Sequence, residues 1–122
     1  MRSDHHEKKK KIRLIIGGLV SILIAWIIID TFTTVPIYLY IDQVQEQQSQ
    51  IIINIPYGSG HYYYKKYKLN QIEDGVYQIQ GYGSMLSGKK YPLEITIDNS
   101  QNQIKEIKQK NSDNQLETIY SQ

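Results

Sequence analysis

Hydrophobic residues follow two different patterns along this chain. From Leu14 to Ile29 the sequence carries no charge and is almost entirely apolar, so hydrophobic side chains would cover every side of a helix. Beyond Pro36, short runs of isoleucine, valine and tyrosine alternate with polar residues at the period-two spacing of β-strands. The first pattern predicts a membrane-spanning helix, and the second predicts a separate β-rich domain.

The apolar segment has nearly the length that a bilayer requires. As a helix, residues 14–29 would span roughly 24 Å, slightly less than the ~30 Å hydrocarbon core. Residues 31–36 can lengthen the span, and the Arg13 side chain can extend back to the lipid headgroups. A buried core helix is the alternative, but the remaining chain is too short to enclose one. We therefore predict a transmembrane anchor with its juxtamembrane segment over residues 14–34.

The charges beside this segment predict its orientation. Residues 1–13 carry a net charge of +4, and the first basic residue after the span is Lys65. The basic residues before the span are Arg2, Lys8, Lys9, Lys10, Lys11 and Arg13. Because positive loops stay in the cytoplasm, residues 1–13 should form a basic cytoplasmic tail, and residues 35–122 an extracytoplasmic domain of a single-pass cell-membrane protein.

The same pattern of a basic flank and an apolar run also occurs in cleavable secretory signals. Here the apolar run is longer than a usual signal core, and no small-x-small cleavage site follows it. The nearest candidate, Asp-Thr-Phe-Thr-Thr from position 30, is poor. We therefore expect an uncleaved signal-anchor.

Small residues cluster on one face of the predicted anchor. Gly17, Gly18 and Ser21 would let two helices approach closely, which makes a homodimer through this face one alternative. The spacing is not Gly-x-x-x-Gly, and glycine is common in membrane helices. The simpler interpretation is that these residues have no role in association.

The region after the anchor contains several segments of strand character, with turn residues between them. The predicted strands are 35–41, 51–55, 61–70, 76–83, 91–98 and 104–110, and 116–120 is either an edge strand or a loose tail. Asp74-Gly75 predicts a hairpin turn, Gly81 and Gly83 predict a bulge or bend, and the glutamine-rich residues 43–50 predict a loop or short exposed helix. The sum is a small mainly-β domain of five to six antiparallel strands, as a curled sheet or partly open barrel.

Residues 100–110 fit two structures. Ser100 and Gln103 have capping-box spacing, and Ile104 and Ile107 have helical spacing. A strand is favoured because residues 95–98, a polar turn and Ile104 together have the layout of a hairpin.

Composition and charge exclude several classes of function. The chain has no cysteine, so disulfides, thiolate metal sites and lipid anchors on cysteine are excluded. Residues 31–122 hold eight basic and nine acidic residues, a balance that argues against nucleic-acid binding. The heavy use of isoleucine, asparagine, lysine and tyrosine is typical of low-GC genomes and indicates a Gram-positive bacterium.

The most distinctive local sequence is HYYYKKYK at residues 61–68. On a strand, Tyr63, Lys65 and Tyr67 would share one face, and Lys66 would lie on the other. Aromatic rings flanked by ammonium groups can stack on rings and pair with phosphates, so these four residues are our candidate ligand- or partner-binding site. The alternative is that tyrosine simply suits a half-hydrated sheet, an interpretation favoured by eleven tyrosines in the chain.

No catalytic, cofactor or metal site is predicted. Ser59 lies near His61 but lacks the nucleophile-elbow pattern and a partnered carboxylate. His5 and His6 are adjacent on the tail and do not make a preformed metal site. We therefore expect a non-enzymatic protein without cofactor or metal.

Two resemblances concern the β-rich region. Residues Asp74–Tyr77 through Gly81–Gly83, then Leu93–Asp98 and Ile104, resemble the opening of extracytoplasmic FMN-binding domains. Those domains attach flavin through a Ser-Gly-Ala-Thr motif, which this sequence lacks, so the resemblance implies the hairpin layout and no covalent flavin. The overall plan also resembles the small YxeA-like proteins of Gram-positive bacteria, with Gly81-Tyr82 and Tyr91–Ile97 as the nearest local matches. This second resemblance implies an apolar N-terminus and a short β-barrel, and no biochemical role.

These expectations lead to two functional hypotheses. In the first, the chain is a membrane-tethered, extracytoplasmic interaction module whose partners are the bilayer and another membrane or envelope protein. Immunity, phage exclusion and accessory service to a membrane complex all fit that geometry. In the second, Tyr63, Lys65, Lys66 and Tyr67 bind an anionic envelope polymer or a lipid headgroup.

Overall fold

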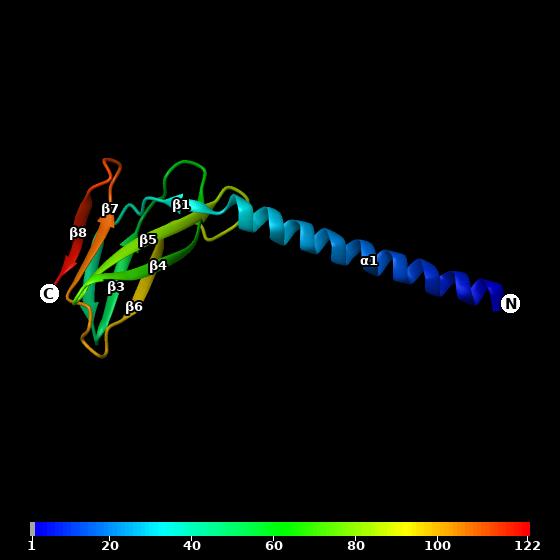
Figure 1. The fold of residues 1–122 in the computed structure, drawn as a ribbon, viewed down its shortest axis with the longest axis horizontal. Coiled ribbons are helices and arrows are strands. Elements are labelled where there is room, and N and C mark those ends of the chain that lie inside the picture. Colours follow the sequence, from blue (N-terminus) through cyan, green and yellow to red (C-terminus); the bar gives the residue numbers. More distant parts are fainter. Residues whose placement is uncertain (1) are drawn as a thin grey trace. The chain divides into compact units, whose positions relative to one another are not determined.

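The chain consists of an N-terminal helix and a small β domain, as we predicted (Figure 1). The computed structural model describes the backbone of residues 2–122 and the side chains from Lys8 onward. One compact unit ends at Thr33, and the second comprises Thr34–Gln122. The predicted fold class is confirmed.

Helix α1 (Arg2–Thr33) is a candidate membrane anchor. Its segment Lys8–Thr33 has 26 residues and includes an 18-residue window with a mean hydropathy of 2.6, so it is long and apolar enough to cross a bilayer. The hydroxyl groups of Ser21, Thr31 and Thr33 each donate a hydrogen bond of 2.8–2.9 Å to the carbonyl four residues earlier. These polar groups are therefore satisfied within the helix, as an apolar solvent demands. The basic tail is the first part of this helix rather than a separate segment.

The β domain contains two sheets. The strands are β1 (Val35–Ile37), β2 (Gln43–Gln47), β3 (Gln50–Ile55), β4 (Tyr63–Glu73), β5 (Val76–Ser84), β6 (Leu93–Asp98), β7 (Glu106–Lys110) and β8 (Leu116–Ser121). In the curled five-stranded sheet, β5 pairs with β4 on one side and with both β1 and β7 on the other, and β8 lies outside β7. The second sheet has the order β2-β3-β6.

The core lies between the inner faces of the sheets and is dominated by isoleucine. Its buried members are Ile37, Leu39, Ile51, Ile53, Ile55, Tyr64, Ile79, Ile95, Ile97, Ile104, Ile107 and Tyr120. Along β3 and β6, every second residue is buried, as period-two alternation requires. The strand predicted at residues 51–55 is confirmed, and as β3 it lies between β2 and β6 in its sheet.

Two further local predictions are confirmed. Asp74-Gly75 forms the two-residue turn between β4 and β5, and Gly75 has a φ of 74°, which glycine adopts without strain. Residues 116–120 form the edge strand β8 rather than a loose tail.

The prediction for the glutamine-rich residues 43–50 is wrong. Residues 43–47 form the edge strand β2, which pairs with β3, and Val44 lies half-buried opposite Ile53. The turn that follows uses Gln48 and Ser49, both with positive φ (52° and 66°). Such a turn is usually marked by Asn-Gly, so the sequence lacks the normal hairpin signal.

Residues 106–110 form strand β7, so the preference for a strand over a helix is confirmed, but its partner is not the one predicted. Instead of pairing with β6, β7 crosses to the other sheet and pairs in parallel with β5. The crossing is held by the buried Asn99, whose side chain accepts a hydrogen bond from Ile104 N (2.9 Å) and donates one to Ile104 O (3.1 Å). Asn99 thus supplies the partners that a neighbouring strand would otherwise provide.

The buried Gln109 likewise uses its side-chain amide to bind main-chain groups, here just beyond the end of β1. Its side chain accepts a hydrogen bond of 2.9 Å from Leu39 N and donates one of 3.0 Å to Leu39 O. The chain beyond Ile37 no longer pairs with β5, so this amide substitutes for a strand neighbour.

The two glycines of β5 make room for apolar side chains, and the predicted bulge lies elsewhere. A Cβ added to Gly81 would lie 2.5 Å from a Leu39 side-chain atom, and one added to Gly83 would lie 2.9 Å from a methyl group of Ile37. The register shifts of the β4–β5 pair occur in β4, next to Lys65 and next to Ile72. The glycines are therefore required by close packing.

Candidate functional site

The irregularity at Lys65 separates the four residues that we predicted as a site. Tyr64 pairs with Gly83 and Lys66 pairs with Tyr82, which leaves Lys65 as an extra residue in β4. An extra residue reverses the faces of the strand beyond it. Tyr67 consequently packs against the core, Lys66 lies on the outer face, and Lys65 and Tyr63 are half-buried.

Tyr64 is the tyrosine of this run that enters the core. Its side chain is buried, and this burial, followed by the neighbouring Tyr67 and Tyr91, raises the pKa of its hydroxyl to about 12. It is therefore a structural residue.

On the outer face, two lysines of β4 lie over an aromatic ring of β5. The Nζ atoms of Lys66 and Lys68 lie 5.7 Å and 5.4 Å from the centre of the Tyr82 ring. The ring quadrupole attracts both cations at this distance. Sequence analysis missed Tyr82 because this contact depends on the register between two strands.

Five lysines form what we call the basic surface: Lys65, Lys66, Lys68, Lys89 and Lys90. The loop that carries Lys89 is joined to β4 by two main-chain hydrogen bonds between Tyr64 and Lys89, of 3.0 Å and 2.7 Å. Lys65 Nζ also donates a hydrogen bond of 2.8 Å to Ser87 Oγ of this loop. Residues 59–72 and 84–93 contain no acidic residue, so this part of a nearly neutral domain is strongly positive.

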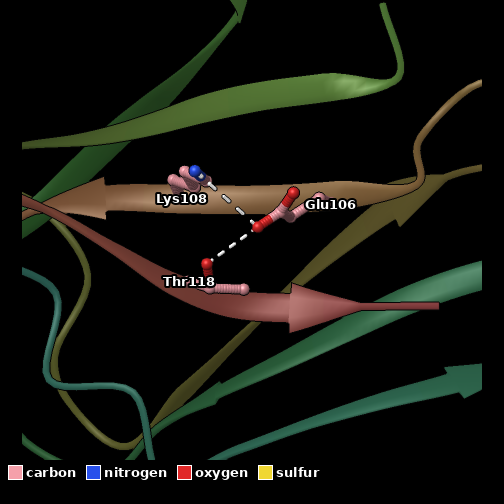
Figure 2. Close-up of polar contacts among 3 residues, drawn as sticks. All are labelled: Glu106, Lys108 and Thr118. Atoms are coloured by element: carbon pink, nitrogen blue, oxygen red, sulfur yellow. Dashed lines mark hydrogen bonds and ion pairs between the residues drawn. The ribbon is translucent and has the colours of Figure 1, made fainter.

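Farther along the same outer face, positive charge is balanced. Lys108 Nζ lies 3.8 Å from Glu106 Oε1, an oxygen that also accepts a 2.8 Å hydrogen bond from Thr118 Oγ1 (Figure 2). A partly exposed pair of this kind contributes about 0–1 kcal/mol to stability.

A second candidate site is a groove between β1 and the β7–β8 turn, with a volume of about 500 Å³. Its lining consists of Pro36, Ile37, Tyr38 and Tyr40 from β1 and the segment after it, Gln80 from β5, and the polar residues Lys110, Asn111, Ser112, Asp113 and Glu117 at and beside the β7–β8 turn. The volume is within the range of ligand sites, and the lining combines an aromatic wall with a polar one. We call this feature the tyrosine groove.

The two tyrosines that line the groove, Tyr38 and Tyr40, belong to a stack of three rings. The Tyr38 and Tyr40 rings meet edge to face at 5.0 Å, and Tyr57 lies tilted against Tyr40 at 5.2 Å. Tyr40 and Tyr57 remain 37% and 60% exposed. The Tyr38 hydroxyl donates a 3.2 Å hydrogen bond to Glu117, and burial together with this carboxylate raises the Tyr38 pKa. No local motif marks this stack, because the isolated bridge between Tyr40 and Tyr57 assembles it.

Metal-ligating side chains do not gather within residues 8–122, where no group of three His, Asp or Glu could hold an ion. His5 and His6, the pair considered from sequence, lie outside the side chains that the structure describes.

Comparisons with protein-family models, with curated proteins and with solved structures find no match for this chain. The resemblances to YxeA-like proteins and to FMN-binding domains therefore stay predictions. The features of the chain that bear on its function are the candidate anchor, the tyrosine groove and the basic surface.

Proposed function

We propose that this chain is a single-pass membrane protein whose β domain acts outside the cytoplasm as a non-enzymatic docking module for another membrane or envelope protein. The apolar part of α1, residues 14–29, follows six basic residues, and this arrangement supports an anchor with a cytoplasmic N-terminus. An anchor keeps the domain beside the bilayer and so raises its effective concentration toward other membrane proteins.

The tyrosine groove carries this proposal. Tyrosine is enriched at the energetic centres of protein interfaces, where its ring packs and its hydroxyl binds water or a partner. Here, Tyr38 and Tyr40 line the same groove as Asp113, Glu117 and Lys110, so the polar wall has one more acid than base. The occupant that fits best is an extended partner segment with an apolar side chain for the rings and a basic one for the carboxylates.

Site-specific crosslinking in cells tests the docking function. A photo-crosslinking phenylalanine derivative would replace Tyr57, which stacks on Tyr40, and Thr96, on the exposed side of β6, would be the control position. We expect one discrete crosslinked protein from position 57 and none from position 96. We also expect Asp113→Lys to abolish the crosslink, because it reverses the charge of the polar wall. Crosslinking that is absent at both positions, or equal at both, would contradict the proposal.

The basic surface favours a second function, the binding of phosphate groups of an anionic envelope polymer or of lipid headgroups. Five lysines without a neighbouring acid in sequence, two of them over Tyr82, support this alternative. Lysine ammonium groups act as point charges toward phosphates.

A further inference from the structure

The loop after β5 exposes two consecutive apolar side chains. Met85 is 56% exposed and Leu86 is 42% exposed. Single exposed apolar residues are ordinary on protein surfaces. An adjacent pair surrounded by lysines instead has the chemistry of segments that enter the lipid interface, where apolar groups reach the acyl boundary and cations stay at the phosphates.

This loop is fixed to the sheet on both sides. Leu86 N donates a 3.1 Å hydrogen bond to the buried Ser84 Oγ, and the main chain of Lys89 pairs with Tyr64. Gly88 has a φ of 142°, and a Cβ added there would lie 2.5 Å from the Tyr64 carbonyl oxygen. The close packing therefore holds Met85 and Leu86 in their exposed positions without an induced rearrangement.

The loop lies at the end of the sheet where the chain enters the domain. Val35, the first residue of β1, pairs with Gly83, two residues before Met85. In sequence, Val35 is separated from the last residue of α1, Thr33, by Thr34 alone. Because a residue spans at most about 3.6 Å, an anchor that crosses the bilayer brings this end of the domain close to the lipid surface.

We propose that Met85 and Leu86 insert at the headgroup boundary of the bilayer, and that the basic surface binds the phosphates of its anionic lipids. The inference rests on the second function above and names the bilayer as its ligand. A soluble anionic polymer would offer phosphates to the lysines but no apolar phase for Met85 and Leu86, so the exposed pair favours lipid.

Fluorescence of the full chain in lipid nanodiscs tests the insertion. The sequence has no cysteine, so Leu86→Cys introduces a unique site for an environment-sensitive dye. Gln101→Cys is the control, because it is exposed in the turn before β7, at the opposite end of β5 from the loop. In discs of phosphatidylcholine with phosphatidylglycerol, we expect a blue-shifted emission and quenching by spin-labelled lipid at position 86 and neither at position 101. High salt should reduce the blue shift and the quenching at position 86, because it screens the attraction between the lysines and the anionic lipids.

Lysine variants of the labelled chain test the electrostatic part. Each lysine near an anionic surface raises the constant for partition onto the lipid about 5-fold. Lys89→Gln with Lys90→Gln should therefore lower the partition constant of the loop about 30-fold. Lys105→Gln with Lys110→Gln removes the same charge elsewhere and should have little effect. Unchanged near-ultraviolet circular dichroism of the tyrosines would show that each variant is folded.

Two results would overturn the inference. One is a dye at position 86 that is no better quenched than the dye at position 101 in every lipid mixture. The other is binding of soluble poly(glycerol phosphate) through Lys89 and Lys90 while position 86 stays in water, which would assign the surface to a polymer. Crosslinking at Tyr57 is independent of these lysines, so a failure here leaves the docking function to be judged by its own experiment.

Discussion

Replacing Gln109 with leucine removes the two hydrogen bonds that the Gln109 side chain makes to the main chain of Leu39. Leucine has nearly the same size but offers no partner to the main chain of Leu39, which is 1% exposed. The substitution therefore leaves one buried N–H and one buried carbonyl without the hydrogen bonds of 2.9 Å and 3.0 Å that they make to the Gln109 amide.

The expected cost is a large part of the stability of the domain. A buried polar group that loses its partner costs about 1–3 kcal/mol, so two such groups cost roughly 2–6 kcal/mol. A unit the size of Thr34–Gln122 has a free energy of unfolding of roughly 4–13 kcal/mol. At about 4–8 °C for each kcal/mol, Gln109→Leu should lower the melting temperature by about 8–48 °C.

Circular dichroism measures this effect on the full chain in detergent. All eleven tyrosines belong to the β domain and the single tryptophan, Trp26, to α1, so the near-ultraviolet tyrosine bands report the unfolding of the domain. Gln71→Leu is the matched control, because Gln71 is an exposed glutamine on β4. A Gln109→Leu melting temperature within 3 °C or so of the control would refute the argument, since about 1 kcal/mol already shifts it by more.

Two other properties of the domain are expected to respond predictably. Gly83→Ala places a Cβ 2.6 Å from the Tyr63 carbonyl oxygen, so it should destabilise the domain by about 1–3 kcal/mol in denaturant unfolding. Gly17 lies in open space on α1, so the control Gly17→Ala should not change the unfolding midpoint of the domain. The Tyr64 pKa of about 12 exceeds its unfolded value of 10.0, so the folded chain retains a proton that the unfolded chain loses, and stability should fall as the pH rises from about 10 to about 12. Tyr64→Phe should flatten that slope, and an unchanged slope would assign the alkaline loss to other groups.

The parts of the fold that follow from short-range sequence signals were predictable. An uncharged run of residues 14–29 has few alternatives to a membrane helix. The continuous β-branched run of residues 51–55 and the period-two alternation of residues 91–98 indicate strands, and Asp74-Gly75 indicates its turn. Each of these signals depends on residues close in sequence.

Pairings between distant segments were not predictable from such signals. Strand β2 has a polar, glutamine-rich sequence and is a strand because β3 offers it an edge. The parallel pairing of β7 with β5 depends on Asn99 and on the path of the chain between the sheets. Both features are set by tertiary contacts that override local propensity.

The candidate sites show the same division. The composition of residues 61–68 drew attention to the correct strand, but one extra residue at Lys65 changed which side chains share its outer face. Lys89 and Lys90 join the basic surface only through the bridge between Tyr64 and Lys89. The tyrosine groove combines residues from β1, the loop after it and the β7–β8 turn, which no spacing rule relates.

The claim on which the whole account depends is that α1 crosses the bilayer and leaves the β domain outside. Protease protection on intact protoplasts, with the full chain detected through a C-terminal tag, tests it most directly. The account predicts that protease added outside removes the tag and leaves a membrane-bound fragment of about the size of α1. A tag that stays protected until the protoplasts are lysed would contradict it.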